Sequence, residues 1–439
     1  MHILQVCFRV PYPPHDGGAI AMYETVRGLA EAGHTVTVLA VNTPKHHQPA
    51  DALAHLGPNV QLVAVDVDTR LSPLKALQNL LLSERPYNVE RFISSHLAET
   101  FKNMLLTQAI DVVHVEGTFV AWYVAVFVAQ EVAAGRLPAR EQLPLFVLRS
   151  QNVEHTIWEM LASREGNPLK KWYLRKLAQR LRAFEHWILP HFDAIIAITE
   201  EDAVRFRRMY ASLPTPPAAA EGAPLPATQR APTIAVMPAS FDLRRLRPAA
   251  TAAQPRTVFM LGSLNWLPNL EGVDWFLREV WPQAHAELPE LELHLAGSHP
   301  PESLTSRPAG QDNVFVHGFV ESSTAFMAQY ELMVVPLLSG GGMRVKVVEG
   351  LAVGKAILST TIGAEGIAAR NNENLLLRDS PAAWLQALRD YYHGRLPLAE
   401  ISQAAARTAH ELYDTQQVTA QLVRLYEQVR PQLATPQLR

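Results

Sequence analysis

Three consecutive glycines at 340–342 precede two cations and a carboxylate. A glycine run destabilises the interior of a helix or strand, but it lets the backbone turn sharply and approach a ligand closely. The apolar pattern that follows predicts a helix over 343–353, with Arg344 and Lys346 in its first turn and Glu349 further along. The free N–H groups and positive dipole end of such a helix favour an anion. These residues therefore predict a site for a phosphate-bearing ligand, with Glu349 placed to accept hydrogen bonds from sugar hydroxyls.

A second interpretation of this loop needs no ligand. A strand–turn–helix unit with a basic helix start can serve the fold alone, and a lone glycine-rich loop is compatible with that role. Cations at a helix N-terminus are locally unfavourable, however, because the helix dipole is positive at that end. A bound anion removes this conflict, so the residues favour the phosphate site.

The glycine loop lies between two predicted strands, 332–336 and 356–359, and a similar unit opens the chain. There a strand over 2–10 leads into a loop that contains Asp16, Gly17 and Gly18, and a helix over 19–32 follows. Open parallel sheets bind ligands at the carboxyl ends of their strands. The loop lacks the G-x-G-x-x-G spacing, so a nicotinamide cofactor is not favoured.

Other polar residues follow predicted strands at the same edge of such a sheet. The candidates read from this placement are Asp16, Gly17, Gly18, Glu116, Gln151, Asn152, Glu154, Ser339, Gly340, Gly341, Gly342 and Met343. No D-x-D pair stands in a suitable loop, so the sequence predicts an anion site that needs no metal.

The composition limits the class of protein. A chain of 439 residues with 48% hydrophobic and 18% charged residues is long and apolar enough for two or three globular domains. The net charge of −3 gives no general attraction to nucleic acid. Cys7 is the only cysteine, so no intrachain disulfide can form, which fits a reducing compartment.

The alternation of strands and helices occurs twice, which predicts two Rossmann-like domains of the α/β class. We expect an N-terminal domain over 1–243, a C-terminal domain over 244–412, and a last helix in 413–439 that returns to the first domain. A Pro- and Ala-rich stretch over 213–232 is predicted to be an exposed, mobile insertion that can be removed.

The N-terminus reads as a strand and not as a signal peptide, and the longest apolar stretch, 119–129, is shorter than the roughly 20 residues that span a bilayer. We expect a cytoplasmic protein, at most attached to the inner face of the membrane. A predicted long helix over 158–189 carries a cluster of cations: Lys170, Lys171, Arg175, Lys176, Arg180 and Arg182. Two interpretations stay open, a solvated helix face or a contact with anionic lipid or a lipid-linked acceptor phosphate.

The run GGGMRVKVVEGLAVGKAILSTTIGAEGI resembles the donor-site motif of the retaining glycosyltransferases of family 4, which have the GT-B fold, two Rossmann-like domains facing each other across a cleft. Many members carry E-x7-E here; this chain has Gly341 at the first position and Glu349 at the second. The resemblance implies a catalytic group in which Arg344 and Lys346 hold the nucleotide diphosphate and Glu349 the ribose.

The resemblance also implies roles for other loops. The Gly17–Gly18 loop would lie near the donor diphosphate and the acceptor, and Gln151 stands where the family often has a histidine that contacts the donor sugar. The loop with Gly262, Ser263 and Asn265 lacks the arginine of many relatives, so Arg344 would supply that charge. Gly318 and Phe319 would line the nucleobase pocket.

The implied reaction is a metal-independent, retaining, hexosyltransferase-type transfer from a nucleotide sugar to an acceptor hydroxyl, in polysaccharide or glycoconjugate synthesis. The donor is a substrate, and no cofactor is expected. The acceptor would be a carbohydrate or a lipid-linked glycan. Two alternatives remain: a non-catalytic nucleotide-sugar-binding protein, which Gln151 and Gly341 favour, and a GT-B nucleotide-sugar epimerase.

Overall fold

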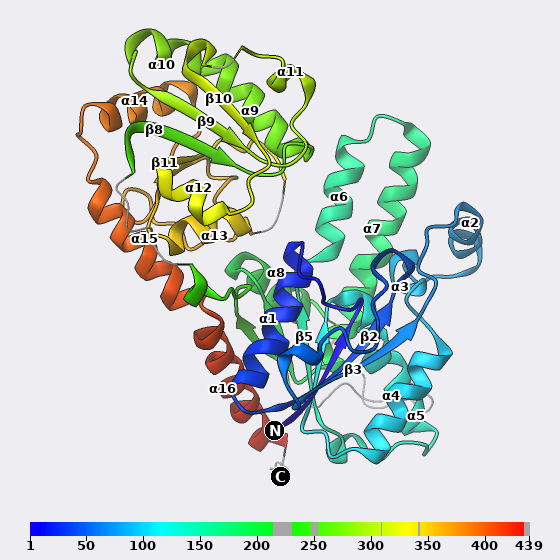
Figure 1. Ribbon diagram of the computed structural model, residues 1–439. Helices are drawn as coiled ribbons and strands as arrows, with labels where there is room; N and C mark the ends of the chain where they lie inside the picture. Colours follow the sequence, from blue (N-terminus) through cyan, green and yellow to red (C-terminus); the bar gives the residue numbers. More distant parts are fainter. Residues whose placement is uncertain (214–230, 247–252, 309, 341–342, 434–439) are drawn as a thin grey trace. The chain divides into compact units, whose positions relative to one another are not determined.

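The computed structural model describes residues 1–213, 231–246, 253–308, 310–340 and 343–433. The chain divides into two compact units: unit 1 is Met1–Ser240 together with the segment from Val418 onward, and unit 2 is Phe241–Gln417. Each unit contains one sheet of parallel strands flanked by helices (Figure 1), which confirms the predicted α/β class with two Rossmann-like halves. The predicted insertion over 213–232 falls almost wholly outside the described residues.

Unit 1 is built on a seven-stranded sheet in the order β3-β2-β1-β4-β5-β6-β7, and every strand pair in it is parallel. Its strands are β1 His2–Cys7, β2 Thr35–Asn42, β3 Val60–Asp66, β4 Val112–Glu116, β5 Leu145–Ser150, β6 Ala194–Ala197 and β7 Thr233–Val236. The strand order reverses between β1 and β4. Ligands bind at such a switch point, beyond the carboxyl ends of the strands, so the loops after β1 and β4 lie where a site is expected.

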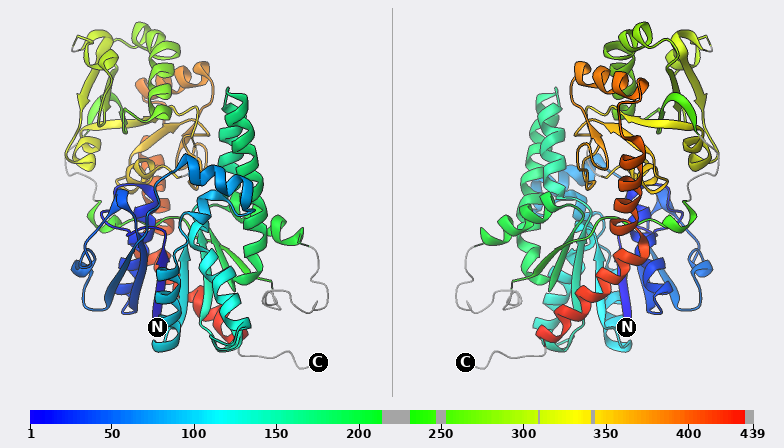
Figure 2. Two further views of the ribbon diagram at one scale, coloured as in Figure 1. Left: turned by 90° about the vertical axis from the view of Figure 1, so that its right-hand side faces the viewer. Right: turned by 90° about the vertical axis from the view of Figure 1, so that its left-hand side faces the viewer.

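Helices cover both faces of this sheet (Figures 1 and 2). The helices of unit 1 are α1 Gly17–Glu31, α2 Pro73–Leu82, α3 Tyr87–Glu90, α4 Ser95–Thr107, α5 Ala129–Ala133, α6 Glu154–Arg164, α7 Pro168–Ile188, α8 Glu200–Ala211 and α16 Thr415–Leu433. Helix α16 reaches unit 1 after the chain has passed through all of unit 2. Its Val418, Leu422 and Tyr426 join one apolar cluster with Met22 and Val26 of α1, so this late segment completes an early core.

The single helix predicted over 158–189 is wrong: the segment forms two helices, α6 and α7, which lie side by side as a hairpin (Figure 2). The break has a local cause. The Asn167 side chain accepts hydrogen bonds from the backbone N–H groups of Leu169 and Lys170, and Pro168 occupies the first helical position of α7. An asparagine N-cap followed by proline starts a new helix.

Unit 2 has a six-stranded parallel sheet in the order β10-β9-β8-β11-β12-β13. Its strands are β8 Gln254–Leu261, β9 Glu292–Ala296, β10 Val314–Gly318, β11 Tyr330–Val335, β12 Ala356–Ser359 and β13 Leu376–Leu377. Its helices are α9 Leu267–Glu279, α10 Trp281–Glu287, α11 Glu302–Thr305, α12 Ser323–Gln329, α13 Val345–Ala352, α14 Pro381–Tyr392 and α15 Leu398–Leu412. The order reverses between β8 and β11, so the loops after these two strands border the switch point of unit 2.

In the described parts of the chain, none of the helices combines the length and the apolar composition that crossing a membrane requires.

Candidate substrate site

The predicted phosphate loop of unit 2 connects β11 to α13, beside the switch point. Gly341 and Gly342 lie outside the described residues. Gly340 has φ +98, a conformation that side chains rarely adopt, and a Cβ there would lie 3.1 Å from an Arg344 guanidinium nitrogen and 3.2 Å from the Trp266 ring. Glycine at this position therefore lets the loop pass close to both side chains.

Arg344 is the N-cap residue of α13, with extended backbone angles, and does not lie in the first turn as predicted. Its guanidinium carbon lies 5.3 Å from the centroid of the Trp266 ring, a cation–π distance. Burial lowers the pKa of Arg344, while the charge of Glu365 raises it; an arginine nevertheless keeps its proton in proteins. The Arg344 cation is therefore held against the Trp266 ring and is partly desolvated at the start of the helix.

Lys346 and Glu349 occupy one face of the first turns of α13. The Lys346 ammonium donates to Glu349 Oε2 over 2.8 Å, and Ser323 Oγ donates to the same oxygen over 3.3 Å. Lys346 is 42% exposed and Glu349 18%, so both remain open to a ligand. The three residues predicted as the catalytic group therefore gather at the N-terminus of one helix.

The loops after β8 and β9 are tied together by small polar residues. Ser263 Oγ donates to Asn265 Oδ1 over 2.8 Å and lies 2.9 Å from Ser298 Oγ. A Cβ at Gly262 would lie 2.8 Å from the amide nitrogen of Asn269, and a Cβ at Gly297 would overlap the carbonyl oxygen of Gly262. Gly297 thus lets the loop after β9 pack against the loop after β8, and Gly262 leaves room for the Asn269 side chain.

The same edge holds Ser339, Gly318 and Phe319 from neighbouring loops. Ser339 Oγ donates to Glu271 Oε2 of α9 over 2.6 Å. The carbonyl of Gly318 accepts from Gly297 N over 2.7 Å, and Phe319 is 73% exposed. Phe319 therefore offers an open aromatic face beside the β9 loop.

Trp266, Ser298 and Ser323, which lie outside the predicted sites, support the predicted group from other segments. The apolar runs that form β8 and β9 end a few residues before Trp266 and Ser298, and that placement could have marked them. Ser323 starts α12 Ser323–Gln329, a short helix that was not expected from the sequence.

In unit 1 the loop after β1 is held by Asp16, the N-cap of α1. Its carboxylate accepts from Ala19 N over 3.1 Å and pairs with Arg9. Burial alone would raise the pKa of Asp16, but the hydrogen bonds from Arg9 and Ala19 outweigh it and lower that pKa. The Gln151 amide donates to Gly18 O over 3.4 Å, and a Cβ at Gly18 would lie 2.9 Å from Gln151 Oε1. The structure therefore brings the loops after β1 and β5 together, with glycine allowing the close approach.

Glu116 is fully buried beneath these loops. Its Oε1 accepts from Gln5 Nε2 over 3.0 Å and lies 3.3 Å from His114 Nε2 and 3.6 Å from an Arg149 nitrogen. Burial raises its pKa, but the charge of Arg149 and the contact with His114 more than offset that, so the pKa of Glu116 is lowered. The carboxylate acts within the core and offers no exposed surface to a ligand.

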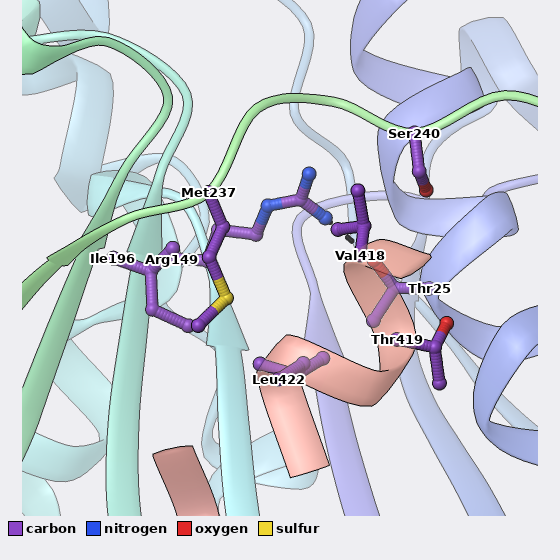
Figure 3. Close-up of a pocket in the computed structure, with 8 residues that line it drawn as sticks. All are labelled: Thr25, Arg149, Ile196, Met237, Ser240, Val418, Thr419 and Leu422. Carbon is purple, nitrogen blue, oxygen red and sulfur yellow. Dashed lines mark hydrogen bonds between the residues drawn. The ribbon is translucent and has the colours of Figure 1, made fainter. Parts of the chain in front are cut away.

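Arg149 links this buried carboxylate to α1. Its guanidinium donates to Ala21 O over 3.1 Å and to Thr25 Oγ1 over 2.5 Å. Figure 3 draws the Arg149 and Thr25 side chains. Beside Arg149 lies a cavity with room for about one water molecule, lined by Thr25, Arg149, Ile196, Met237, Ser240, Val418, Thr419 and Leu422. None of the predicted substrate-binding residues of unit 1 lines this cavity. We therefore assign it to the packing beneath α1 and not to the substrate site.

Glu154 is the first residue of α6, after Asn152 in the loop that follows β5. From α7, Glu185 accepts from Glu154 N over 2.8 Å and from His155 N over 3.1 Å, so its carboxylate caps α6. Burial and the nearby negative charge of Glu185 raise the pKa of Glu154 to about 8. At neutral pH the Glu154 carboxyl therefore keeps its proton and can donate a hydrogen bond at the sheet edge.

This pKa predicts a loss of stability as the pH rises. The unfolded carboxyl titrates near 4.5 and the folded one near 8, so the stability conferred by the neutral form is complete below pH 4.5 and is lost as the pH rises towards 8. At about 1.4 kcal/mol per pKa unit, the rise from 4.5 to about 8 corresponds to a loss of about 5 kcal/mol in all, of which about 4 kcal/mol falls between pH 5 and 9. Glu154→Gln should flatten this dependence in thermal unfolding between pH 5 and 9. The exposed Glu159 of the same helix supplies the control, Glu159→Gln, which should keep the wild-type slope; equal slopes in all three proteins would refute the assignment.

Within the described residues, no group of three or more His, Cys, Asp or Glu side chains is arranged to hold a metal ion.

Two family profiles match this chain. The profile "Glycosyl transferase 4-like domain" matches residues 16–219, and the profile "Glycosyl transferases group 1" matches residues 255–393. The first span begins at the N-cap of α1. The second contains Arg344, Lys346 and Glu349 at the start of α13. A curated protein from Klebsiella pneumoniae, described as an uncharacterized 44.6 kDa protein in the cps region, is 22% identical over 425 residues, covering 95% of this chain and 97% of its own.

Solved structures resemble the whole chain. Sucrose-phosphate synthase from Thermosynechococcus elongatus matches with a TM-score of 0.65 at 14% identity, covering 98% of this chain and all (100%) of that one. Alr3699/HepE from Anabaena, solved in complex with UDP, matches with a TM-score of 0.59 at 13% identity, covering 98% and 100% of the two chains. At such identities the likeness is one of fold, and that fold is GT-B.

Proposed function

Since the chain belongs to the group 1 glycosyl transferases and therefore transfers a sugar, we propose that it takes the sugar from a nucleotide-sugar donor and attaches it, with retention of configuration, to an acceptor hydroxyl. The observation that carries the proposal is the group at the start of α13, where Arg344 and Lys346 bring two cations to a helix N-terminus beside Glu349. Neutralising the charge that develops on a leaving diphosphate is usually the largest contribution to such a transfer.

In this proposal each residue has one task. The backbone N–H groups of α13, with Arg344 and Lys346, bind the diphosphate. Glu349 accepts hydrogen bonds from the ribose hydroxyls. The loop with Gly262, Ser263 and Asn265 borders the diphosphate, and the loop with Gly318 and Phe319 borders the base.

On the side of unit 1, Asp16, Gly17, Gly18 and Gln151 form the edge that we assign to the acceptor and to the donor sugar. The proton held by Glu154 adds a donor there. The acceptor proton passes to the leaving phosphate, so the proposal requires no protein base, and it also requires no protein nucleophile.

The proposed donor is a uridine diphosphate sugar, supported by the UDP in the Alr3699/HepE structure. The proposed pathway is polysaccharide synthesis, supported by the relative described from a cps region. The acceptor would be a carbohydrate or a lipid-linked glycan, and the enzyme would act in the cytoplasm at the inner face of the membrane.

A screen of nucleotide sugars for thermal stabilisation tests the donor, and proton NMR of the product tests the stereochemistry. One uridine diphosphate sugar should raise the melting temperature, and its anomeric configuration should be kept in the product. Stabilisation without transfer to any acceptor would point to a non-catalytic binding protein. Conversion of the donor without an acceptor would point to an epimerase.

Transfer should survive metal removal, because Arg344 and Lys346 supply positive charge at the proposed diphosphate position. We expect the same initial rate in EDTA as in Mg²⁺, measured by release of the nucleoside diphosphate. A rate that falls in EDTA and returns with Mg²⁺ or Mn²⁺ would contradict this part of the proposal.

A further inference from the structure

Helix α2 of unit 1 turns its leucines outward. Leu74, Leu77 and Leu81 recur at helical spacing on one side and are 66%, 52% and 71% exposed. Leu71 before the helix and Leu82 at its end are also exposed. A helix at the surface of a globular protein normally packs such a stripe against the core. In α2 the apolar stripe therefore faces solvent and not the core.

Polar contacts hold α2 in place. Of its ten residues, all of which the structure describes, only Asn79 is buried. The Asn79 amide donates to Arg85 O over 3.0 Å and to Glu90 Oε2 over 2.8 Å. From α7, Arg180 donates to Asn79 Oδ1 over 3.2 Å and to Leu80 O over 2.9 Å. Because these bonds fix the helix from its inner side, the outward leucines are not needed to attach it.

The neighbouring helix α7 adds cations to this surface. Leu169, Tyr173 and Lys176 precede Arg180 by eleven, seven and four residues, so they share the face of α7 that contacts α2. Below this segment Leu177, Leu181 and Phe184 enter the core, whereas Leu169 and Trp172 stay exposed. The lower half of α7 is therefore attached to the core through its apolar residues, whereas the N-terminal half leaves its apolar residues exposed.

Both helices carry charge of one sign along this surface. Between Pro168 and Phe184, α7 carries six cations and no acid. Between Pro73 and Leu82, α2 carries Lys75 and no acid. Isologous contact between two copies of this chain would place these two basic surfaces against each other, which is repulsive. An anionic apolar partner fits both properties.

We propose that the outward leucine side of α2, together with the exposed N-terminal half of α7, docks on an anionic lipid membrane. An interfacial helix pairs an apolar side with cations and lies in the plane of the headgroups. The leucines of α2 enter the boundary of the acyl chains, while Lys170 and Lys176 contact the headgroups; Lys171 instead faces α6, where its ammonium donates to Ser163 O. The inference deepens the membrane location proposed above and rests on it, but its test does not depend on sugar transfer.

A single label tests insertion. Cys7 is the only cysteine of the sequence and is buried, so the full-length Leu77→Cys protein can be labelled selectively with an environment-sensitive fluorophore such as NBD. With phosphatidylglycerol vesicles the emission should shift to the blue and rise several-fold; with phosphatidylcholine vesicles it should change little. Leu106→Cys, at an exposed leucine near the end of α4, is the matched control and should not respond. An equal response from both labels would overturn the proposal.

Vesicle sedimentation tests the two parts of the surface. Leu74→Gln/Leu77→Gln/Leu81→Gln should lower the bound fraction on phosphatidylglycerol at least ten-fold and leave the melting temperature and its shift by a nucleotide unchanged. Lys170→Gln/Lys176→Gln should lower it similarly. No binding by the wild type at low salt, or undiminished binding by either variant, would overturn the proposal. So would a wild-type dimer in analytical ultracentrifugation that the leucine substitutions dissociate.

Discussion

Arg149→Met should destabilise unit 1 by about 3–5 kcal/mol, because it leaves a buried carboxylate without its cation. Arg149 is 4% exposed and Glu116 fully buried, and their closest atoms are 3.6 Å apart. The same substitution removes the two hydrogen bonds to α1, through Ala21 O and Thr25 Oγ1. Urea unfolding of the purified protein measures the effect.

Two further variants show whether the buried charge is the cause. Arg136→Met removes an arginine that is 58% exposed from its pair with Glu131, which keeps Lys102 at 3.3 Å, and should cost at most about 1 kcal/mol. Glu116→Gln combined with Arg149→Met should recover part of the loss, since no uncompensated charge then remains. If the double variant loses as much unfolding free energy as the two single variants together, the loss comes from packing and not from the buried charge.

Lys346→Ala should weaken the binding of a nucleoside diphosphate by about 1.5–3 kcal/mol, the range of a hydrogen bond to a charged group. That is roughly a 10- to 150-fold rise in Kd, which calorimetry with UDP measures. The substitution removes a cation that is 42% exposed at the start of α13 and leaves Glu349 with Ser323 as a partner.

Arg395→Ala is the matched control for this prediction. Arg395 is also a partly exposed cation of unit 2 in a 2.8 Å pair with a carboxylate, that of Asp390, but it lies beyond α14. We expect its UDP affinity to equal that of the wild type. If Lys346→Ala also leaves the affinity unchanged in a folded protein, the diphosphate does not bind at the start of α13.

Much of the fold could be predicted because its signals are local. The strands expected over 2–10 and 356–359, which became β1 and β12, and the helix expected over 19–32, which became α1, needed only a short window of sequence. The break between α6 and α7 was equally local, in Asn167 and Pro168, but the residues on both sides of it favour a helix, which concealed it.

Contacts between distant segments could not be predicted. Periodicity tells which residues share a side of α2, but not which side faces the core; that depends on Arg180 of α7. The raised pKa of Glu154 likewise depends on Glu185, which only the hairpin brings near. The glycine loop, the cations and Glu349 could be named beforehand because they lie in one short stretch, whereas Trp266, which stacks on Arg344, comes from another strand end.

The return of α16 to unit 1 affects how the chain can fold during synthesis. Val418, Leu422, Leu425 and Tyr426 belong to the apolar cluster of β1, β2 and α1, and the Tyr426 hydroxyl lies 2.7 Å from His114 Nδ1. A ribosome that adds roughly 5–20 residues per second needs on the order of ten seconds or more to produce Phe241–Gln417. During that interval the emerged part of unit 1 exposes an uncovered apolar face, while unit 2 can already close around its own sheet. The second unit in the sequence is thus the first that can finish folding, and the nascent first unit is the natural client for a chaperone that binds exposed apolar surface.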